Sequence, residues 1–221
     1  RVIEREFIDS GDFKNWAIPQ AVHSWVFVLD ADERFTPELR REIGSILASG
    51  PKCRGYWVYR MNHFMGHRLR HTSWARDRVI RLFQRDAGRY RLHTDHSEVD
   101  LPAGEVGCLE HRLIHYTCWD YDRYLAKMCR YTEQQAVLWH RQGRQPSLFR
   151  LIANGPLRFL RCYIMHAGIL DGRAGFQVAA LTGFYSFLKQ ARLWQKTMGL
   201  RPEDVEPTAS QDAAAAETTA G

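Results

Sequence analysis

The chain has 221 residues, of which 45% are hydrophobic and 25% charged, so it can form one domain with a substantial core, with or without appendages. Its net charge of +6 favours acidic partners, among them nucleic acid, anionic lipid and phosphorylated small molecules. Five cysteines without CxxC spacing argue against a disulfide framework or a structural zinc site, and they fit a reducing cytosolic setting. We find no signal peptide and no apolar run of transmembrane length.

The first part of the chain alternates between strand and helix patterns, which is typical of an α/β fold. The run WVFVLD at 25–30 is continuously apolar, which predicts a strand buried on both faces of a parallel or mixed sheet. Thr36 fits the N-cap of the next helix, Pro37 its first position and Gly50 its end. The elements expected are a strand at 2–8, a short helix or turn at 11–22, a strand at 25–30, a helix between Thr36 and Gly50, and strands at 55–64, 78–84 and 105–118.

The remainder reads as helical, with helices expected at 121–143, 147–168 and 175–199. We expect the second helix to be interrupted at Asn154-Gly155-Pro156, because proline breaks helical hydrogen bonding. The end of the chain lacks large apolar residues, which predicts disorder. The chain thus divides into an α/β domain at 1–118, a helical region at 119–199 and a disordered tail at 200–221.

The apolar run at 25–30 ends in an acidic cluster, Asp-Ala-Asp-Glu. Asp30 and Asp32 are two residues apart, so on a strand they point to the same face and can reach one divalent cation. Mg²⁺ prefers a few carboxylates together with waters and phosphate oxygens. The alternative is that the acids only solvate a strand end and help to start the next helix. An EF-hand loop is excluded, because Phe35 occupies its glycine position and Arg41 its twelfth position.

The segment KNWAIPQAVHSWVFVLDADERFTPELRREI resembles family 2 glycosyltransferases, and in particular the bacterial group that includes lipopolysaccharide-core β-1,4-glucosyltransferases. The resemblance spans residues 10–195. The matching positions are Lys14 and Asn15, Leu29 to Glu33, Pro37 to Leu39, Gly66, Trp74, Arg81-Leu82-Phe83, His115, and Leu170 to Gly175. Members of the family carry a further βαβ unit upstream that holds the nucleotide, and we expect this unit to be missing here. They also often show His-Glu where this chain has His96-Ser97-Glu98.

The resemblance implies a partial GT-A fold, a Rossmann-like mixed sheet with flanking helices, followed by a C-terminal helical region that could associate with a membrane. It implies an inverting enzyme whose DXD motif, Asp30 and Asp32, would hold Mg²⁺ or Mn²⁺. The base would be Glu98, with Asp95 as the second candidate, although the same segment also reads as a polar loop. His93 and His96 read as surface histidines rather than a metal pair. The residues expected to bind substrate are Lys14, Asn15, Glu33, Arg81 and His96.

The implied partners are a nucleotide-sugar donor, by default a UDP-sugar, and a lipid-linked or lipopolysaccharide-core acceptor that receives a hexose such as glucose. The implied location is the cytoplasmic side of the inner membrane. Eight arginines between 68 and 91 suit phosphate but also read as a solvated face. The segment 147–168 mixes apolar residues with arginines, so it fits either an anionic membrane surface or ordinary helix packing.

Two other functions compete with glycosyl transfer. One is a basic nucleic-acid-binding module, but the sequence holds no zinc finger, RRM signature or clear helix-turn-helix pattern, and we expect no nucleic-acid partner. The other is a non-catalytic, membrane-associated fragment, which would need no intact nucleotide pocket. Salt-dependent oligonucleotide binding would favour the first alternative. Vesicle binding without nucleotide-sugar binding would favour the second.

Overall fold

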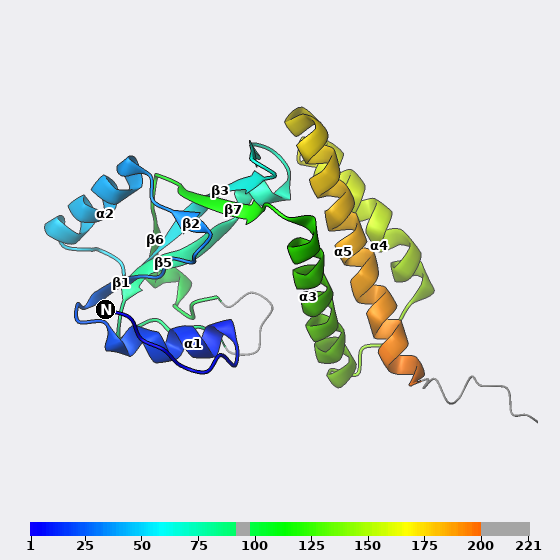
Figure 1. Ribbon diagram of the computed structural model, residues 1–221, viewed down its shortest axis with the longest axis horizontal. Coiled ribbons are helices and arrows are strands. Elements are labelled where there is room, and N and C mark those ends of the chain that lie inside the picture. The colour runs from blue at the N-terminus through cyan, green and yellow to red at the C-terminus, as the bar shows by residue number, and fades with distance from the viewer. Residues whose placement is uncertain (92–97, 200–221) are drawn as a thin grey trace, which may run out of the picture.

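The computed structural model describes residues 1–91 and 98–199 as a sheet flanked by two helices, beside three long helices (Figure 1). The α-helices are α1 (Ser10–Ala17), α2 (Pro37–Ser49), α3 (Tyr121–Arg141), α4 (Leu148–Leu160) and α5 (Gly172–Met198). The strands are β1 (Trp25–Phe27), β2 (Glu33–Arg34), β3 (Gly55–Phe64), β4 (His67–Arg68), β5 (Arg78–Gln84), β6 (Val106–Cys108) and β7 (Leu113–Cys118). The short turns are the 3₁₀ helices η1 (Ile18–Gln20), η2 (Ser73–Arg76), η3 (Ala103–Glu105) and η5 (Gly168–Asp171), and the π-helix η4 (Arg161–Met165).

The sheet is mixed and is built around the long strand β3. Its order is β1-β5-β3-β7-β2, and β4 and β6 also pair with β3. β5 and β4 run antiparallel to β3, whereas β6 and β7 run parallel to it. The mixed sheet with flanking helices and a helical C-terminal region confirms the predicted fold class, a partial GT-A α/β fold.

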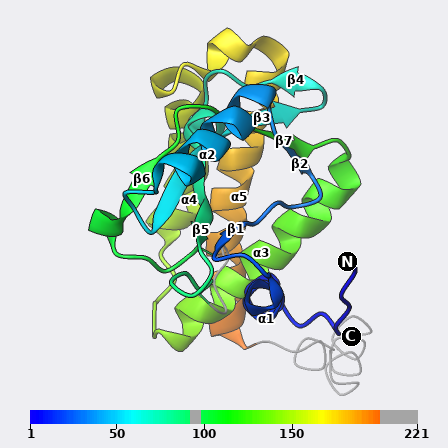
Figure 2. The ribbon, with the colours of Figure 1, turned by 90° about the vertical axis from the view of Figure 1, so that its left-hand side faces the viewer.

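Helices α1 and α2 lie on opposite sides of the sheet (Figures 1 and 2). The Thr36 hydroxyl accepts a hydrogen bond from the Leu39 N–H at 3.1 Å, which confirms the predicted N-cap of α2. Leu39 is fully buried and packs against Val58 and Leu82 of the sheet. On the other side, Ile18 packs in a second cluster with buried residues of β5, Ile80 and Phe83, and with Tyr90 and Val99. The sheet therefore separates two small cores.

A third core joins the sheet to the helices at one end of β3. Phe64 and Leu69 pack there against Cys162 and Val178, which come from η4 and α5. The Asp171 carboxylate accepts hydrogen bonds from the backbone N–H groups of Arg70 at 3.0 Å and His71 at 2.9 Å, fixing the turn before α5 to the loop after β4. In the first turn of α5, a Cβ on Gly175 would collide with the Gly168 carbonyl oxygen of η5, so the close approach requires glycine.

Four expectations about the elements were wrong. Residues 2–8 form no strand; Val2, Phe7 and Ile8 are exposed, so their alternation marks no buried face. β1 ends at Phe27 and is a half-buried edge strand that pairs antiparallel with β5, rather than a strand buried on both faces. The stretch 105–118 divides into β6 and β7, which both run beside β3.

The fourth error concerns the second long helix. α4 continues through Pro156, and only after Leu160 does it change, into the π-helix η4. Pro156 is exposed, and the neighbouring Gly155 is buried against α5, so packing holds the helix together where local sequence predicts a break. The predicted tail at 200–221 lies outside the described residues.

Candidate functional site

The acidic cluster forms a tight turn between β1 and β2. The Glu33 N–H donates to the Asp30 carbonyl at 3.0 Å, and the Glu33 carboxylate accepts from the Asp30 N–H at 3.1 Å. The Asp32 carbonyl accepts from the Tyr116 N–H of β7 at 2.9 Å. Glu33 opens β2 and is buried, whereas 44% of the Asp32 side chain is exposed. The turn thus directs one acid inward and leaves another accessible.

Arg81, from the middle of β5, is the cation at the centre of this turn. Its guanidinium Nη2 contacts the carboxylates of Asp30 and Glu33, the latter at 2.6 Å, although only 4% of the side chain is exposed. Burial alone would lower the pKa of Arg81, but the charges of Glu33 and Asp30 raise it above its ordinary value. The arginine therefore stays charged and holds both acids.

Lys14 of α1 adds a second cation, with its Nζ 2.8 Å from the other carboxylate oxygen of Asp30. Burial alone would raise the pKa of Asp30, but the charges of Arg81 and Lys14 hold it below its ordinary value. The structure thus brings together four of the residues that the sequence singled out, Lys14, Asp30, Glu33 and Arg81.

Asp32 is held from the other side by His115 of β7. The His115 Nε2 lies 3.4 Å from the Asp32 carboxylate, and its Nδ1 lies 2.5 Å from the Asn62 side-chain oxygen. The Asn62 amide is oriented by donating to the Trp74 carbonyl, so its oxygen faces the histidine. The hydrogen bond from His115 lowers the pKa of Asp32 against the effect of burial, and the charges of His115 and Lys127 add to it. The contact with His115 therefore favours the ionised form of Asp32 while its side chain stays partly exposed.

Sequence reasoning missed this support, since it named His115 only as a matching position and did not single out Asn62. A third residue of the surroundings, Arg60 of β3, lies 3.6 Å from the Glu33 carboxylate and also contacts Asp77. These side chains come from strands far apart in the chain, and the register of β3 against β7, which pairs Asn62 with His115, brings two of them together.

Asn15 joins α1 to the strand segment after β5. Its amide donates to the Tyr90 carbonyl at 2.9 Å and accepts from the Tyr90 N–H at 2.8 Å. The Tyr90 hydroxyl in turn lies 3.5 Å from Arg81, and Lys14 lies 5.0 Å from the centre of the Tyr90 ring. Asn15 therefore positions its neighbour Lys14, and direct contact of Asn15 with substrate stays a prediction.

Glu98 lies on the short segment that pairs with Tyr90 and Arg91. Tyr90 forms a bridge with Val99, and the Arg91 N–H donates to the Glu98 carbonyl at 2.9 Å, so the Glu98 backbone is fixed one residue away from this bridge. Glu98 is exposed in this structure. The other two candidates in this segment, Asp95 and His96, lie outside the described residues.

The sequence predicted that Asp30 and Asp32 hold a divalent metal ion, and the structure supplies only part of a ligand set. Within residues 1–91 and 98–199, no group of three or more His, Cys, Asp or Glu side chains is placed to hold a metal ion. Asp30 and Asp32 offer hard oxygen donors, but both oxygens of Asp30 already contact cations. This arrangement fits Mg²⁺ or Mn²⁺ bound through few protein ligands, with water and phosphate oxygens as the others. It does not fit a site made of protein ligands alone.

Comparison with known proteins places the chain among sugar-transferring enzymes. No family model matches the chain, and no solved structure matches it. It is 31% identical over 185 residues to the lipopolysaccharide core biosynthesis glycosyltransferase LpsC of Rhizobium meliloti, covering 83% of this chain and 68% of that protein. It is 25% identical over 211 residues to an uncharacterized glycosyltransferase of Rickettsia typhi, covering 91% of this chain and 72% of that protein. The chain therefore belongs to the glycosyltransferase family that includes LpsC, as its motifs predicted.

Proposed function

We propose that this glycosyltransferase moves a hexose from a UDP-sugar to the lipopolysaccharide core or its lipid-linked precursor, with inversion, at the cytoplasmic face of the inner membrane. The observation that carries the proposal is the acidic turn, in which Asp32 stays accessible while Arg81 and Lys14 hold its neighbours. The likeness to LpsC supports a role in lipopolysaccharide core synthesis.

Arg81 and Lys14 reduce the negative charge of the acidic turn. Asp30, Asp32 and Glu33 place three negative charges in one turn, and such a turn by itself would repel a nucleoside diphosphate. Arg81 and Lys14 offset two of these charges by direct contact. We assign them to positioning the turn and to keeping its net charge low enough for a diphosphate to approach.

Asp32, with Asp30 beside it, would hold Mg²⁺ or Mn²⁺. The ion, when bound, supplies positive charge against the departing diphosphate. His115 contacts the Asp32 carboxylate and lowers its pKa further, which favours the ionised state that a hard cation needs.

Glu98 is our candidate for the base. The exposed Glu98 carboxylate, on the segment that pairs with Tyr90, would take the proton of an acceptor hydroxyl as that oxygen attacks the anomeric carbon from the side opposite the diphosphate. Attack from that side inverts the anomeric configuration. Asp95 remains the second candidate, and His96 is proposed to position the acceptor.

The test is a transfer assay with the full-length protein, radiolabelled UDP-glucose, and lipopolysaccharide isolated from a strain that lacks the gene. We expect label in the lipopolysaccharide, a β-linkage by NMR, loss of transfer with EDTA and recovery with Mg²⁺ or Mn²⁺. An α-linkage would contradict inversion, and transfer that resists EDTA would contradict the metal. Transfer from none of a panel of UDP-sugars would overturn the proposed donor class.

A further inference from the structure

The helical part leaves an apolar surface uncovered along α4, the turns after it and the adjoining side of α5; we name this surface the α4–α5 face. Phe149 is 76% and Met165 75% exposed, and large apolar side chains follow along the same elements. Those of α4 and η4 include Ile152, Leu157, Leu160 and Ile164, and those of α5 are Phe176, Phe184 and Phe187. Soluble monomers rarely expose contiguous apolar patches larger than a few hundred Å² unless something binds there.

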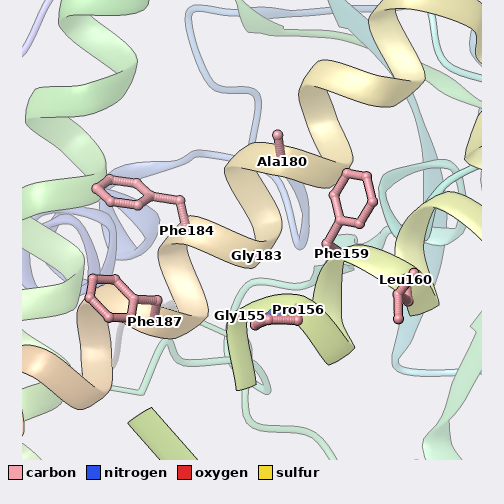
Figure 3. Close-up of a pocket in the computed structure, with 8 residues that line it drawn as sticks. All are labelled: Gly155, Pro156, Phe159, Leu160, Ala180, Gly183, Phe184 and Phe187. Atoms are coloured by element: carbon pink, nitrogen blue, oxygen red, sulfur yellow. The ribbon is translucent and has the colours of Figure 1, made fainter. Parts of the chain in front are cut away.

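A groove of about 420 Å³ divides this face where α4 and α5 cross (Figure 3). The helices approach closely because Gly155 faces Gly183; a Cβ on Gly183 would lie 2.8 Å from the Gly155 carbonyl oxygen. Figure 3 shows Phe184 and Phe187 on one side of the groove and Phe159 on the other. All eight lining residues are glycine or apolar, so the groove suits hydrocarbon rather than a polar ligand.

The charges around the face have one sign. Residues 142–199 contain eight Lys or Arg and a single acid, Asp171, whose carboxylate is occupied by the backbone of Arg70 and His71. Four exposed arginines lie on the elements of the face, Arg150, Arg158, Arg161 and Arg173. None of the four forms an ion pair within residues 1–91 and 98–199. Apolar residues framed by unpaired arginines form the pattern of a helix that lies in an anionic interface.

We propose that the α4–α5 face binds the surface of a bilayer that contains anionic lipid. Phe149, Ile164 and their apolar neighbours would enter the interface to the depth of the upper acyl chains, and the arginines would extend to the phosphates. Among the described residues, no helix is both long and apolar enough to cross a membrane. In Figure 1, α4 lies on the side of the bundle away from the sheet, which leaves the acidic turn free.

Charge decides between lipid and a second copy of the chain. In a symmetric dimer through this face, each copy would present its arginines to those of the other, with no acid on the face to pair with them. An anionic bilayer instead offers negative charge over the whole contact. The inference deepens the proposed function, since a lipid-linked acceptor would be reached from the membrane surface, and it rests on that function for its biological purpose alone.

The test is flotation of the full chain with vesicles of phosphatidylcholine, with or without phosphatidylglycerol. We expect binding to the mixed vesicles that weakens as salt increases. The double substitution Phe149→Glu/Ile164→Glu should weaken this binding on the order of 100-fold, because two apolar side chains that would insert into the bilayer are lost. The matched control is Val22→Glu, an equally exposed valine in the loop before β1, which should bind as the wild type does.

A second variant separates charge from apolar insertion. Arg150→Gln/Arg158→Gln/Arg161→Gln should weaken binding to the mixed vesicles on the order of 100-fold, and it should leave the much weaker binding to phosphatidylcholine unchanged. Circular dichroism of each variant establishes that it folds.

Absence of flotation with the mixed vesicles would overturn the inference. So would a dimer in sedimentation velocity that the double substitution abolishes, which would assign the face to a second copy. Because no sugar is transferred in these measurements, their failure leaves the proposed enzymatic function untouched. Failure of the transfer assay likewise would not contradict lipid binding by the α4–α5 face.

Discussion

The sheet part and the helical part of this chain use charge in opposite ways. Around the acidic turn, charges are paired and turned inward: Arg81 is 4% exposed and contacts a Glu33 side chain with no exposed surface. Along α4, arginines are exposed and unpaired beside bare apolar side chains. Paired internal charge fixes the geometry of a site, whereas exposed arginines beside exposed apolar side chains form the pattern of an interfacial helix. We therefore propose a catalytic role for the acidic turn and a membrane-binding role for the helices.

The largest expected effect on stability follows removal of the buried charge of Arg81. Arg81→Met leaves Glu33 and Asp30 without their shared cation, so we expect a loss of about 3–5 kcal/mol in the free energy of unfolding. Urea denaturation followed by circular dichroism measures it. The control is Arg41→Met, which removes an exposed pair with Glu38 on α2 and should cost about 0–1 kcal/mol. Equal losses in the two variants would show that the buried network does not hold the turn.

A smaller effect is expected at Gly175, where α5 packs against the turn η5. Gly175→Ala forces a Cβ against the Gly168 carbonyl, and we expect it to destabilise the protein by about 3 kcal/mol. Gly44→Ala is the matched control, because nothing lies within 4 Å of its added Cβ on α2. Removing a helical glycine there should stabilise the protein by about 0.5–1 kcal/mol. Thermal denaturation should show a lower melting temperature for Gly175→Ala and a higher one for Gly44→Ala. An unchanged melting temperature of Gly175→Ala would contradict the close packing.

The smallest effect concerns the few ion pairs of the bundle. Glu133 of α3 contacts Lys196 at 2.6 Å and Arg192, both on α5, and the hydrogen bond from Lys196 lowers its pKa against the effect of burial. Because the folded pKa is lowered, this stabilisation is present above the ordinary value of 4.5 and is lost as pH falls through the folded value. Glu133→Gln should therefore flatten the fall in stability below that pH. An unchanged pH profile by urea denaturation would contradict it.

Local signals accounted for much of the fold. Thr36 and Pro37 mark the start of α2 and Gly50 marks its end, as the sequence predicted. β3 and β5 have the bounds that their apolar runs predict. The wrong predictions concern elements whose bounds depend on tertiary contacts with other elements. The length of β1 depends on its edge position beside β5, and α4 passes through Pro156 because α5 packs against it.

The candidate site divides in the same way. The resemblance named Lys14, Asp30, Glu33 and Arg81, and the fold brings these four into contact. The support of Asp32 by His115 and Asn62 depends on the register of β3 against β7, which no local pattern specifies. The roles of Asp32 in metal binding and of Glu98 as base remain predictions.

The most direct test of the account is the activity of Asp32→Asn in the full-length enzyme. The substitution keeps the shape of an exposed side chain and removes the charge that would bind the cation, so we expect transfer to fall by roughly 100-fold or more with the fold unchanged. Asp86→Asn, at an exposed acid in the turn after β5, is the matched control and should retain activity. Full activity of Asp32→Asn, with Mg²⁺ dependence intact, would contradict the central claim that the acidic turn is the metal-binding part of a glycosyltransferase site.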